Sequence, residues 1–462
     1  MVQICASFIT AWRMKEGRKS QESLGISSHL LSPYHSKLTL SRLYDFFRHC
    51  HLAFALFDRT KFLQQFEDYQ IPRDLLQTIL LITQQVLHSG HDTTIMHPSS
   101  ALDVLNESTF KTLECWGEWI TVDVFQQACL LTYYDFHQNS GPNVWMKAGQ
   151  LTRQAYRYGL NELDDPDQCA LYSYRRVDED EIEEWRKIWW FIYCLDSYSN
   201  TSSGMPFIIE LGSIRTALVG GGLTQDPTCS HPATMIFLPN NTGDLWETLR
   251  NIIRGGRQLN FNIHMVTTTL LREANRLHRL HIQSCPQRVY DQITALKEHI
   301  SAVRLALPSG YLSPSRNTLI DESQYDHHAR LVCVLHLHLA RLLLVLPPFQ
   351  PQIGNEWFQN WCESLASCQD IAAVVQEWDS TFTSATDPAI CLAIIPALIV
   401  LQLHNRCGHE DDQITLTRIA SNSNVLLLFL DQFSSLWSLP RVLKGKISAP
   451  KYPASVTDSL SV

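Results

Sequence analysis

The stretch DEDEIEEWRKIWWFIYCLDSYS, residues 178–199, gives the strongest helical signal in this sequence. Ile182, Trp185, Trp189, Ile192 and Asp196 recur every three or four residues and therefore share one face of a helix. The second half of the stretch is apolar on its other faces too, which is typical of a helix buried nearly all round. We therefore predict a central core helix.

Helical periodicity continues on both sides of this stretch. It runs through residues 43–54, 75–83, 122–136, 145–156, 246–283, 289–303, 327–346, 357–378, 390–404 and 414–437. Residues 204–243 are interrupted by glycines and prolines and indicate an irregular connection. With no convincing strand and no strict repeat, the sequence predicts an all-α fold, a large irregular multi-helix array over residues 38–440. Residues 1–37 are expected to be a tail or remnant, and 441–462 a second tail.

The composition indicates a globular protein with no bulk attraction to nucleic acid. Of the 462 residues 45% are apolar and 18% are charged, and the formal net charge is −9. Two small basic groups could contact phosphate: Arg13, Lys15, Arg18 and Lys19, and then Arg272, Arg276 and Arg279 on one helix face. For both groups we predict ordinary solvated surface charge.

The cysteines and histidines do not form a metal-binding pattern. The thirteen cysteines are scattered singly, and no pair has the two-residue gap of a zinc site. His336 and His338 point to different faces of a helix, whereas His278 and His281 have a suitable step but no evident third ligand. We predict no metal site and no cofactor.

Other function classes find little support in the sequence. Nucleophile elbows, phosphate-binding glycine loops and dinucleotide fingerprints are missing, so no catalytic residue is predicted. The apolar runs at 391–403 and 331–346 fall short of the roughly 20 residues that span a bilayer, and we interpret both as buried helices with no membrane contact. The first ten residues lack a basic leader, so an intracellular protein is expected.

A family resemblance begins in the core helix. The order of residues resembles the fungal-specific transcription factor domain, the middle homology region of fungal zinc-cluster transcription factors, in EWRKIWW at 184–190, then Asp196, then SGMP at 203–206. The preceding helix pair is similar to the family pattern as well. The resemblance is clear over residues 40–210 and generic to about 440, and it departs from the family at Asn161 and Met205.

The residues that carry this resemblance are expected to be mainly structural, the alternative being that they line an effector pocket. They are Trp145, Gly149, Arg153, Gly159, Arg186, Trp189, Trp190, Asp196, Gly204 and Pro206. Trp185 and Trp189 are one turn apart and are expected to pack on the same neighbour, and Glu183 can pair with Lys187. Arg186 and Asp196 need partners if they are buried, because an unpaired interior charge is costly.

The resemblance implies a nuclear regulator of transcription that controls a metabolic or secondary-metabolite gene cluster. The six-cysteine zinc cluster that precedes this region in the family is not found in residues 1–37. DNA contact is therefore expected to be indirect, through a zinc-cluster transcription factor or a homodimer. Three alternatives stay open: a longer transcript that encodes the zinc cluster, a helical adaptor with no transcriptional role, and an enzyme. A small-molecule effector is compatible with this function, but the sequence does not place its site.

Overall fold

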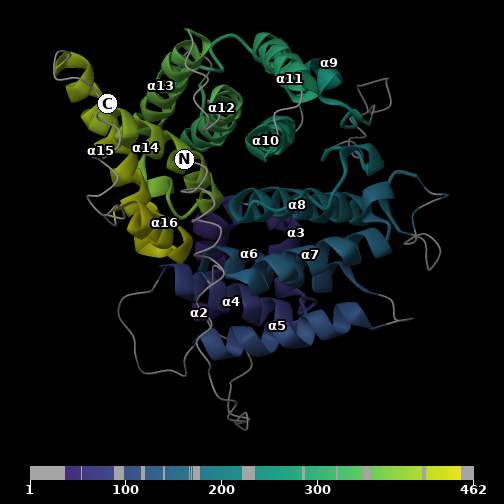
Figure 1. Ribbon diagram of the computed structural model, residues 1–462. Coiled ribbons are helices and arrows are strands. Elements are labelled where there is room, and N and C mark those ends of the chain that lie inside the picture. The colour runs from purple at the N-terminus through teal and green to yellow at the C-terminus, as the bar shows by residue number, and fades with distance from the viewer. Residues whose placement is uncertain are drawn as a thin grey trace.

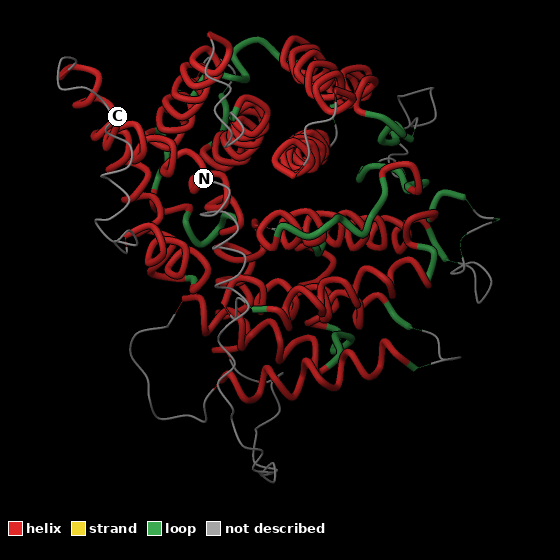
Figure 2. The backbone as a smooth tube through the Cα atoms, in the orientation of Figure 1, coloured by secondary structure: helices red, strands yellow, loops and turns green. Residues whose placement is uncertain are grey.

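The computed structural model describes residues 37–448, with gaps at 54, 88–97, 116–119, 139–140, 166, 168, 170–176, 221–234, 257, 284–286, 319–320, 347–354 and 408–412. Helices and loops account for this described part of the chain, and no residue in it forms a strand (Figure 2). This confirms the predicted all-α multi-helix array.

The N-terminal helices form the lower part of the molecule in Figure 1. They are α2 (Lys37–Asp45), α3 (Arg59–Glu67), α4 (Arg73–Leu87), α5 (Pro98–Glu114), α6 (Val122–Gln138) and α7 (Pro142–Arg157). Helix α6 contacts α4, α5 and α7. Helix α5 was not predicted, because its buried face includes the polar residues Asn106 and Thr109, each 4% exposed, which interrupt the apolar pattern.

Helix α8 (Glu179–Ser203) lies across this layer and joins it to the rest of the molecule (Figure 1). Its N-cap Asp178 accepts a hydrogen bond from the Glu181 backbone N–H, and Gly204 ends it with a φ of +68°. The helix contacts α6, α7 and α10, and its three tryptophans are 0% exposed. The prediction of a central core helix is confirmed.

The C-terminal helices pack one after another on the far side of α8. They are α9 (Leu245–Gly255), α10 (Leu259–Gln283), α11 (Gln287–Ala306), α12 (Gln324–Val345), α13 (Asn355–Gln376), α14 (Cys391–Cys407), α15 (Gln413–Leu436) and α16 (Ser438–Ser448). The single predicted run at 246–283 is two helices, because Gly256 adopts a left-handed φ of +64° and ends α9.

The last described helix returns to the N-terminal layer. The Gln138 side chain at the end of α6 donates to the Leu436 carbonyl over 3.0 Å and accepts from the Ser438 backbone N–H over 3.1 Å. Helix α16 runs to Ser448, past the expected boundary at residue 440, and the expected tail residues 1–36 and 449–462 lie outside the described residues.

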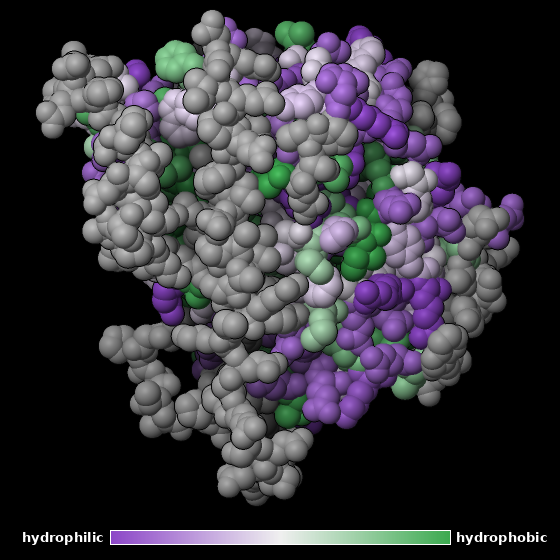
Figure 3. All heavy atoms as spheres, viewed as in Figure 1, coloured by the Kyte–Doolittle hydropathy of each residue, from purple (hydrophilic) through white to green (hydrophobic). Residues whose placement is uncertain are grey.

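Hydrophobic burial is continuous from the first described helix to the last. One core cluster extends from Leu43 to Leu443. On the face shown in Figure 3, the visible described residues are mostly hydrophilic and the apolar ones form small patches. The apolar surface of the helices is therefore used mainly within the fold.

Two described helical segments are long and apolar enough to cross a membrane, judged by length and composition alone. They are Gln324–Val345 and Pro388–Arg406, with 22 and 19 residues, so the length argument from the sequence was wrong. In the fold, 78% and 61% of their most apolar windows are buried, as in core helices of globular proteins. The prediction that both are buried helices is confirmed.

Candidate functional site

The C-terminal end of α8 carries a buried charge network that we call the α8 junction: Asp196, Arg272, Asn200, Trp145 and the loop 205–209. Asp196 is 1% exposed, and its Oδ2 accepts from Arg272 Nη1 of α10 over 2.9 Å. The same guanidinium donates to Ser197 Oγ over 2.8 Å and to the Ile209 carbonyl over 2.6 Å. Each buried charge thus has a countercharge, as interior ions require.

The loop after α8 folds back onto the same carboxylate. The backbone N–H groups of Ile208 and Ile209 donate to Asp196 over 3.1 and 3.2 Å. Phe207 lies under two guanidinium groups, 4.3 Å from Arg272 and 5.2 Å from Arg279, both within cation–π range. The glycine and proline of the family motif therefore turn the chain into a loop that α10 holds in place.

Helix α7 closes the α8 junction from the other side. Trp145 Nε1 donates to Asn200 Oδ1 over 2.8 Å, and Asn200 Nδ2 donates to Asp196 Oδ1 over 2.6 Å. A Cβ at Gly149 would lie 3.1 Å from Ile208 Cδ1, so the absence of a side chain lets the loop approach α7 closely. Three helices and one loop thus meet at a single carboxylate.

The other end of α8 has a second charge network, centred on Arg186. This residue is 1% exposed and pairs with both Asp164 and Glu183. Burial lowers the pKa of Arg186, but Asp164 and Glu183 together raise it above its usual value, so the guanidinium stays charged. The sequence paired Glu183 with Lys187, whereas in the structure Glu183 accepts from Arg186 and from the Gly220 backbone N–H.

The motif tryptophans Trp185 and Trp189 meet aromatic rings of different helices, rather than one shared ring. Trp185 meets Phe125 of α6 edge-on, with ring centroids 5.4 Å apart, and Trp189 meets Tyr156 of α7 at 5.6 Å. Trp190 Nε1 donates to the Ala217 carbonyl over 2.7 Å. The tryptophans therefore fix α8 against two helices and a loop.

The remaining motif residues have simpler surroundings. Gly159 has a left-handed φ of +72° directly after α7, where a side chain would be strained. Arg153 and Pro206 are exposed; Pro206 belongs to the loop of the α8 junction, whereas Arg153 lies outside it.

The predicted surface role of the α10 arginines is wrong for Arg272. It is 7% exposed and belongs to the α8 junction, and Arg279 donates to the Met205 carbonyl. Arg276 is 39% exposed and pairs with Glu273 of its own helix. The other basic group, Arg13 to Lys19, lies outside the described residues.

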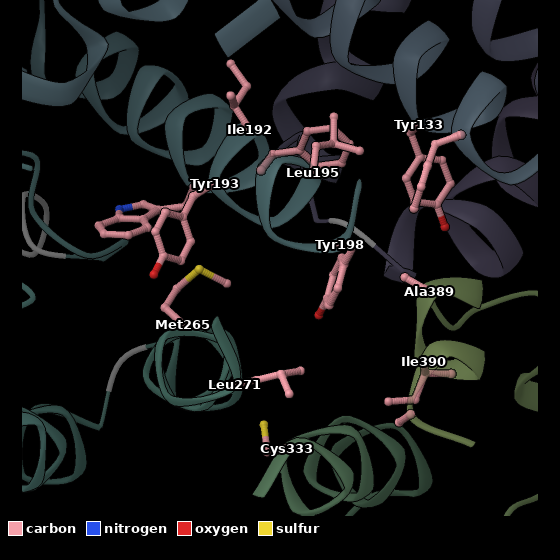
Figure 4. Packing of buried hydrophobic residues seen from close by; sticks show 14 of the residues in the cluster. Tyr133, Ile192, Tyr193, Leu195, Tyr198, Met265, Leu271, Cys333, Ala389 and Ile390 are labelled. Carbon is pink, nitrogen blue, oxygen red and sulfur yellow. The ribbon is translucent and has the colours of Figure 1, made fainter. Parts of the chain in front are cut away.

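A cavity of about 610 Å³ lies beside the α8 junction, between α8, α10, α12 and the segments 308–317, 321–322 and 382–390. Its volume is in the range of small-molecule sites. Figure 4 shows Tyr198 reaching from α8 toward α12, with Tyr133 and Ile390 on one side and Met265 on the other. Eight aromatic residues line it: Tyr133, Trp190, Phe191, Tyr198, Phe261, Tyr311, Tyr325 and Phe382.

A tyrosine and two histidines form a polar group at the cavity wall. The Tyr198 hydroxyl is 2.8 Å from His264 Nε2 and 3.2 Å from His336 Nε2. Burial lowers the pKa of His264 to about 4, against a smaller opposing effect of Asp387, and burial also lowers the pKa of His336. Both imidazoles are therefore neutral at pH 7.

Charged groups of one sign dominate the cavity lining. Its described residues include four carboxylates, Asp321, Glu322, Asp326 and Asp387, but only one guanidinium, Arg330. That guanidinium is fully engaged: it binds both oxygens of Glu322 over 2.6 and 3.0 Å and donates to backbone carbonyls of 311, 313 and 315. The other three carboxylates have no lysine or arginine opposite them in the described lining.

The described part of the structure gives no geometry for metal binding, and several of its thiols are buried. No group of three or more His, Cys, Asp and Glu side chains there is placed to hold a metal ion. Burial raises the pKa of Cys50 to about 12 and raises the pKa of Cys129 and Cys391, so these thiols stay protonated.

Sequence reasoning missed the cavity and the role of Arg272. An arginine between Leu270, Leu271 and Ala274 is a signal of burial that could have been used. Asp387 before Pro388 indicates a helix cap. Its place in the cavity lining depends on tertiary packing, which a local sequence pattern does not predict.

Comparison with known proteins gives one match. The family model described as "Fungal specific transcription factor domain" matches residues 43–333, well over half of the 462 residues. The matched range includes all of α8 and the α8 junction but ends before Asp387. Neither the curated proteins nor the solved structures contain a match.

Proposed function

Because the chain belongs to the family of fungal specific transcription factor domains, we propose that it is a nuclear regulator of transcription controlling a metabolic or secondary-metabolite gene cluster. The observation that carries the proposal is the family match over residues 43–333, which includes the central helix α8 and extends into α12. The family is one of transcription factor domains rather than enzymes, and the proposed function needs no active site.

We propose that this regulator reaches DNA through a protein partner, either a zinc-cluster transcription factor or a second copy. The net charge of −9 opposes direct attraction to phosphate. On the described basic face of α10, Arg272 is buried against Asp196, Arg279 is half-buried and donates to the Met205 carbonyl, and Arg276 is half-buried and pairs with Glu273. Two half-buried arginines are too little for a DNA-binding surface.

The test is chromatin occupancy of a tagged copy in its fungal host, together with mapping of the transcript ends. The expected result is enrichment at a defined set of promoters that disappears when a zinc-cluster partner is deleted. Enrichment that persists in every such deletion would contradict indirect binding.

A matched variant separates direct from indirect contact. Arg276→Ala removes the exposed charge of α10 and only a helix-surface ion pair, so occupancy is expected to stay unchanged. A several-fold loss at all promoters with this variant would instead indicate direct phosphate contact by α10. Exclusion from the nucleus without promoter enrichment would overturn the regulator proposal and favour the adaptor.

A further inference from the structure

We propose that the cavity beside the α8 junction binds a small organic cation, a protonated amine carried on an aromatic or alicyclic body. This inference goes beyond the proposed function, because it concerns binding by the purified chain and holds or fails independently of chromatin occupancy.

The first support is the combination of aromatic walls with unbalanced carboxylates. Aromatic faces attract cations, and desolvation strengthens the attraction. Tyr133, Trp190 and Phe382 line a space that also contains Asp321 and Asp387. Since Glu322 already neutralises Arg330, the described lining has more negative than positive charge without a ligand.

Asp387 is the best placed of these carboxylates. It lies at the start of the 3-10 helix Pro388–Ile390, and its side chain is 20% exposed. One oxygen, Oδ1, accepts from the Ala389 backbone N–H over 2.8 Å and lies 3.1 Å from His137 Nε2. Burial raises the pKa of Tyr133 and Cys194, and the Asp387 charge raises both further, as expected for a carboxylate near these two lining residues.

The wall also excludes the opposite kind of ligand. An anion would meet several carboxylates, an already engaged guanidinium and the neutral His264. Its desolvation would then be uncompensated. The Tyr198 hydroxyl and His264 offer a second polar contact, suited to a hydroxyl or amine on the ligand body.

The experiment measures the affinity of the full chain for three probes of one shape: 2-(2-naphthyl)ethylammonium, 2-(2-naphthyl)ethanol and 2-naphthylacetate. Calorimetry or naphthyl fluorescence gives the dissociation constants. We expect the ammonium to bind about tenfold more tightly than the alcohol, as for a charged group at a partly desolvated carboxylate, and the acetate to bind weakest. Equal binding of all three probes, or no binding of the ammonium, overturns the proposal.

Two variants place the effect at the cavity. Asp387→Asn keeps a capping oxygen but removes the charge, and it is expected to abolish most of the preference for the ammonium. Asp379→Asn is the matched control, since Asp379 caps the neighbouring 3-10 helix Ser380–Phe382 in the same way but is not in the lining. An unchanged preference in Asp387→Asn, or an equal loss in Asp379→Asn, overturns the assignment.

A second cavity variant keeps the test valid if Asp387→Asn fails to fold. Asp321→Asn removes another lining charge, at a positive φ of +52° that asparagine tolerates. It is expected to reduce the ammonium preference several-fold. If Asp387→Asn does not fold, an unchanged preference for the ammonium in Asp321→Asn overturns the proposal.

Discussion

The α8 junction and the neighbouring cavity use residues of the same helix in opposite ways. At the junction Asp196 is matched by Arg272 and by backbone donors, so no charge is left over. Two positions further on, Tyr198 faces a space where carboxylates outnumber the available cations. Paired charges fix a structure, whereas unbalanced charges beside a cavity weaken it unless a ligand arrives. In this chain the residues of the α8 junction are thus paired within the fold, whereas the cavity next to them has unbalanced charge in its described lining.

The largest expected effect comes from breaking the paired side of this comparison. Arg272→Ala leaves Asp196 without its countercharge at a site that is 1% exposed, and it is expected to lower the free energy of unfolding by about 3–5 kcal/mol. Chemical denaturation measures this change.

Its control is one helical turn away. Arg276→Ala removes a half-exposed pair with Glu273 and is expected to cost less than about 1 kcal/mol. Similar losses in the two variants would mean that the junction does not hold the fold together.

The second prediction concerns pH and the cavity wall. His264 faces Tyr198 of α8 and His336 of α12; burial lowers its pKa, and the charge of Asp387 raises it by less. The folded protein keeps His264 neutral to about pH 4, whereas the unfolded chain takes up a proton near pH 6.5, so between these values the unfolded state binds more protons. The contribution of His264 to the free energy of unfolding is therefore fully present above about pH 6.5. It is lost as the pH falls toward 4, by up to about 1.4 kcal/mol per pH unit.

A His264 variant tests whether this residue accounts for the pH dependence of the unfolding free energy. His264→Asn is expected to make the dependence of the unfolding free energy on pH shallower between pH 7 and 5, since the group that titrates is gone. An unchanged slope would show that other histidines account for the acid sensitivity.

The third prediction compares carboxylates directly. Asp387→Asn is expected to change the free energy of unfolding by less than about 1 kcal/mol, because the amide oxygen can still accept from the Ala389 N–H and lie beside His137 Nε2. Asp196→Asn, by contrast, leaves the buried Arg272 unpaired and is expected to cost about 3 kcal/mol or more. Thermal unfolding of the two variants measures the difference. Equal losses of unfolding free energy would show that the junction carboxylate contributes no more to stability than the cavity carboxylate.

The smallest effects test how tightly the junction is packed. Alanine in a helix is favoured over glycine by about 1 kcal/mol, so Gly445→Ala, which meets nothing within 4 Å, is expected to stabilise the chain by that amount. Gly149→Ala places its Cβ 3.1 Å from Ile208 and is expected to gain less or to lose stability. An equal gain in stability at both glycines would show that the loop carrying Ile208 moves aside at no cost.

The sequence was sufficient for most of the helices, although it missed α5 and merged α9 with α10. The three-to-four-residue spacing of Ile182, Trp185 and Trp189 predicts α8 because periodicity reflects local geometry. It also predicts that Arg186 and Asp196 need partners. It could not name Arg272, 76 residues away, because pairing across such a separation depends on how helices cross. The cavity could not be predicted either, because its shape depends on how side chains from helices far apart in the sequence pack together.

The hydrogen bonds of Gln138 have a consequence for how the protein is made. This side chain bonds to the Leu436 carbonyl, 298 residues later in the chain. At about 5–20 residues per second, a ribosome needs roughly 15–60 s to synthesise that interval. During that time the end of α6 lacks the segment that bonds to Gln138, so this contact can form only after nearly all of the described chain has been synthesised. A chain that ends before residue 436 would lack the partner of Gln138 and would leave the end of α6 uncovered.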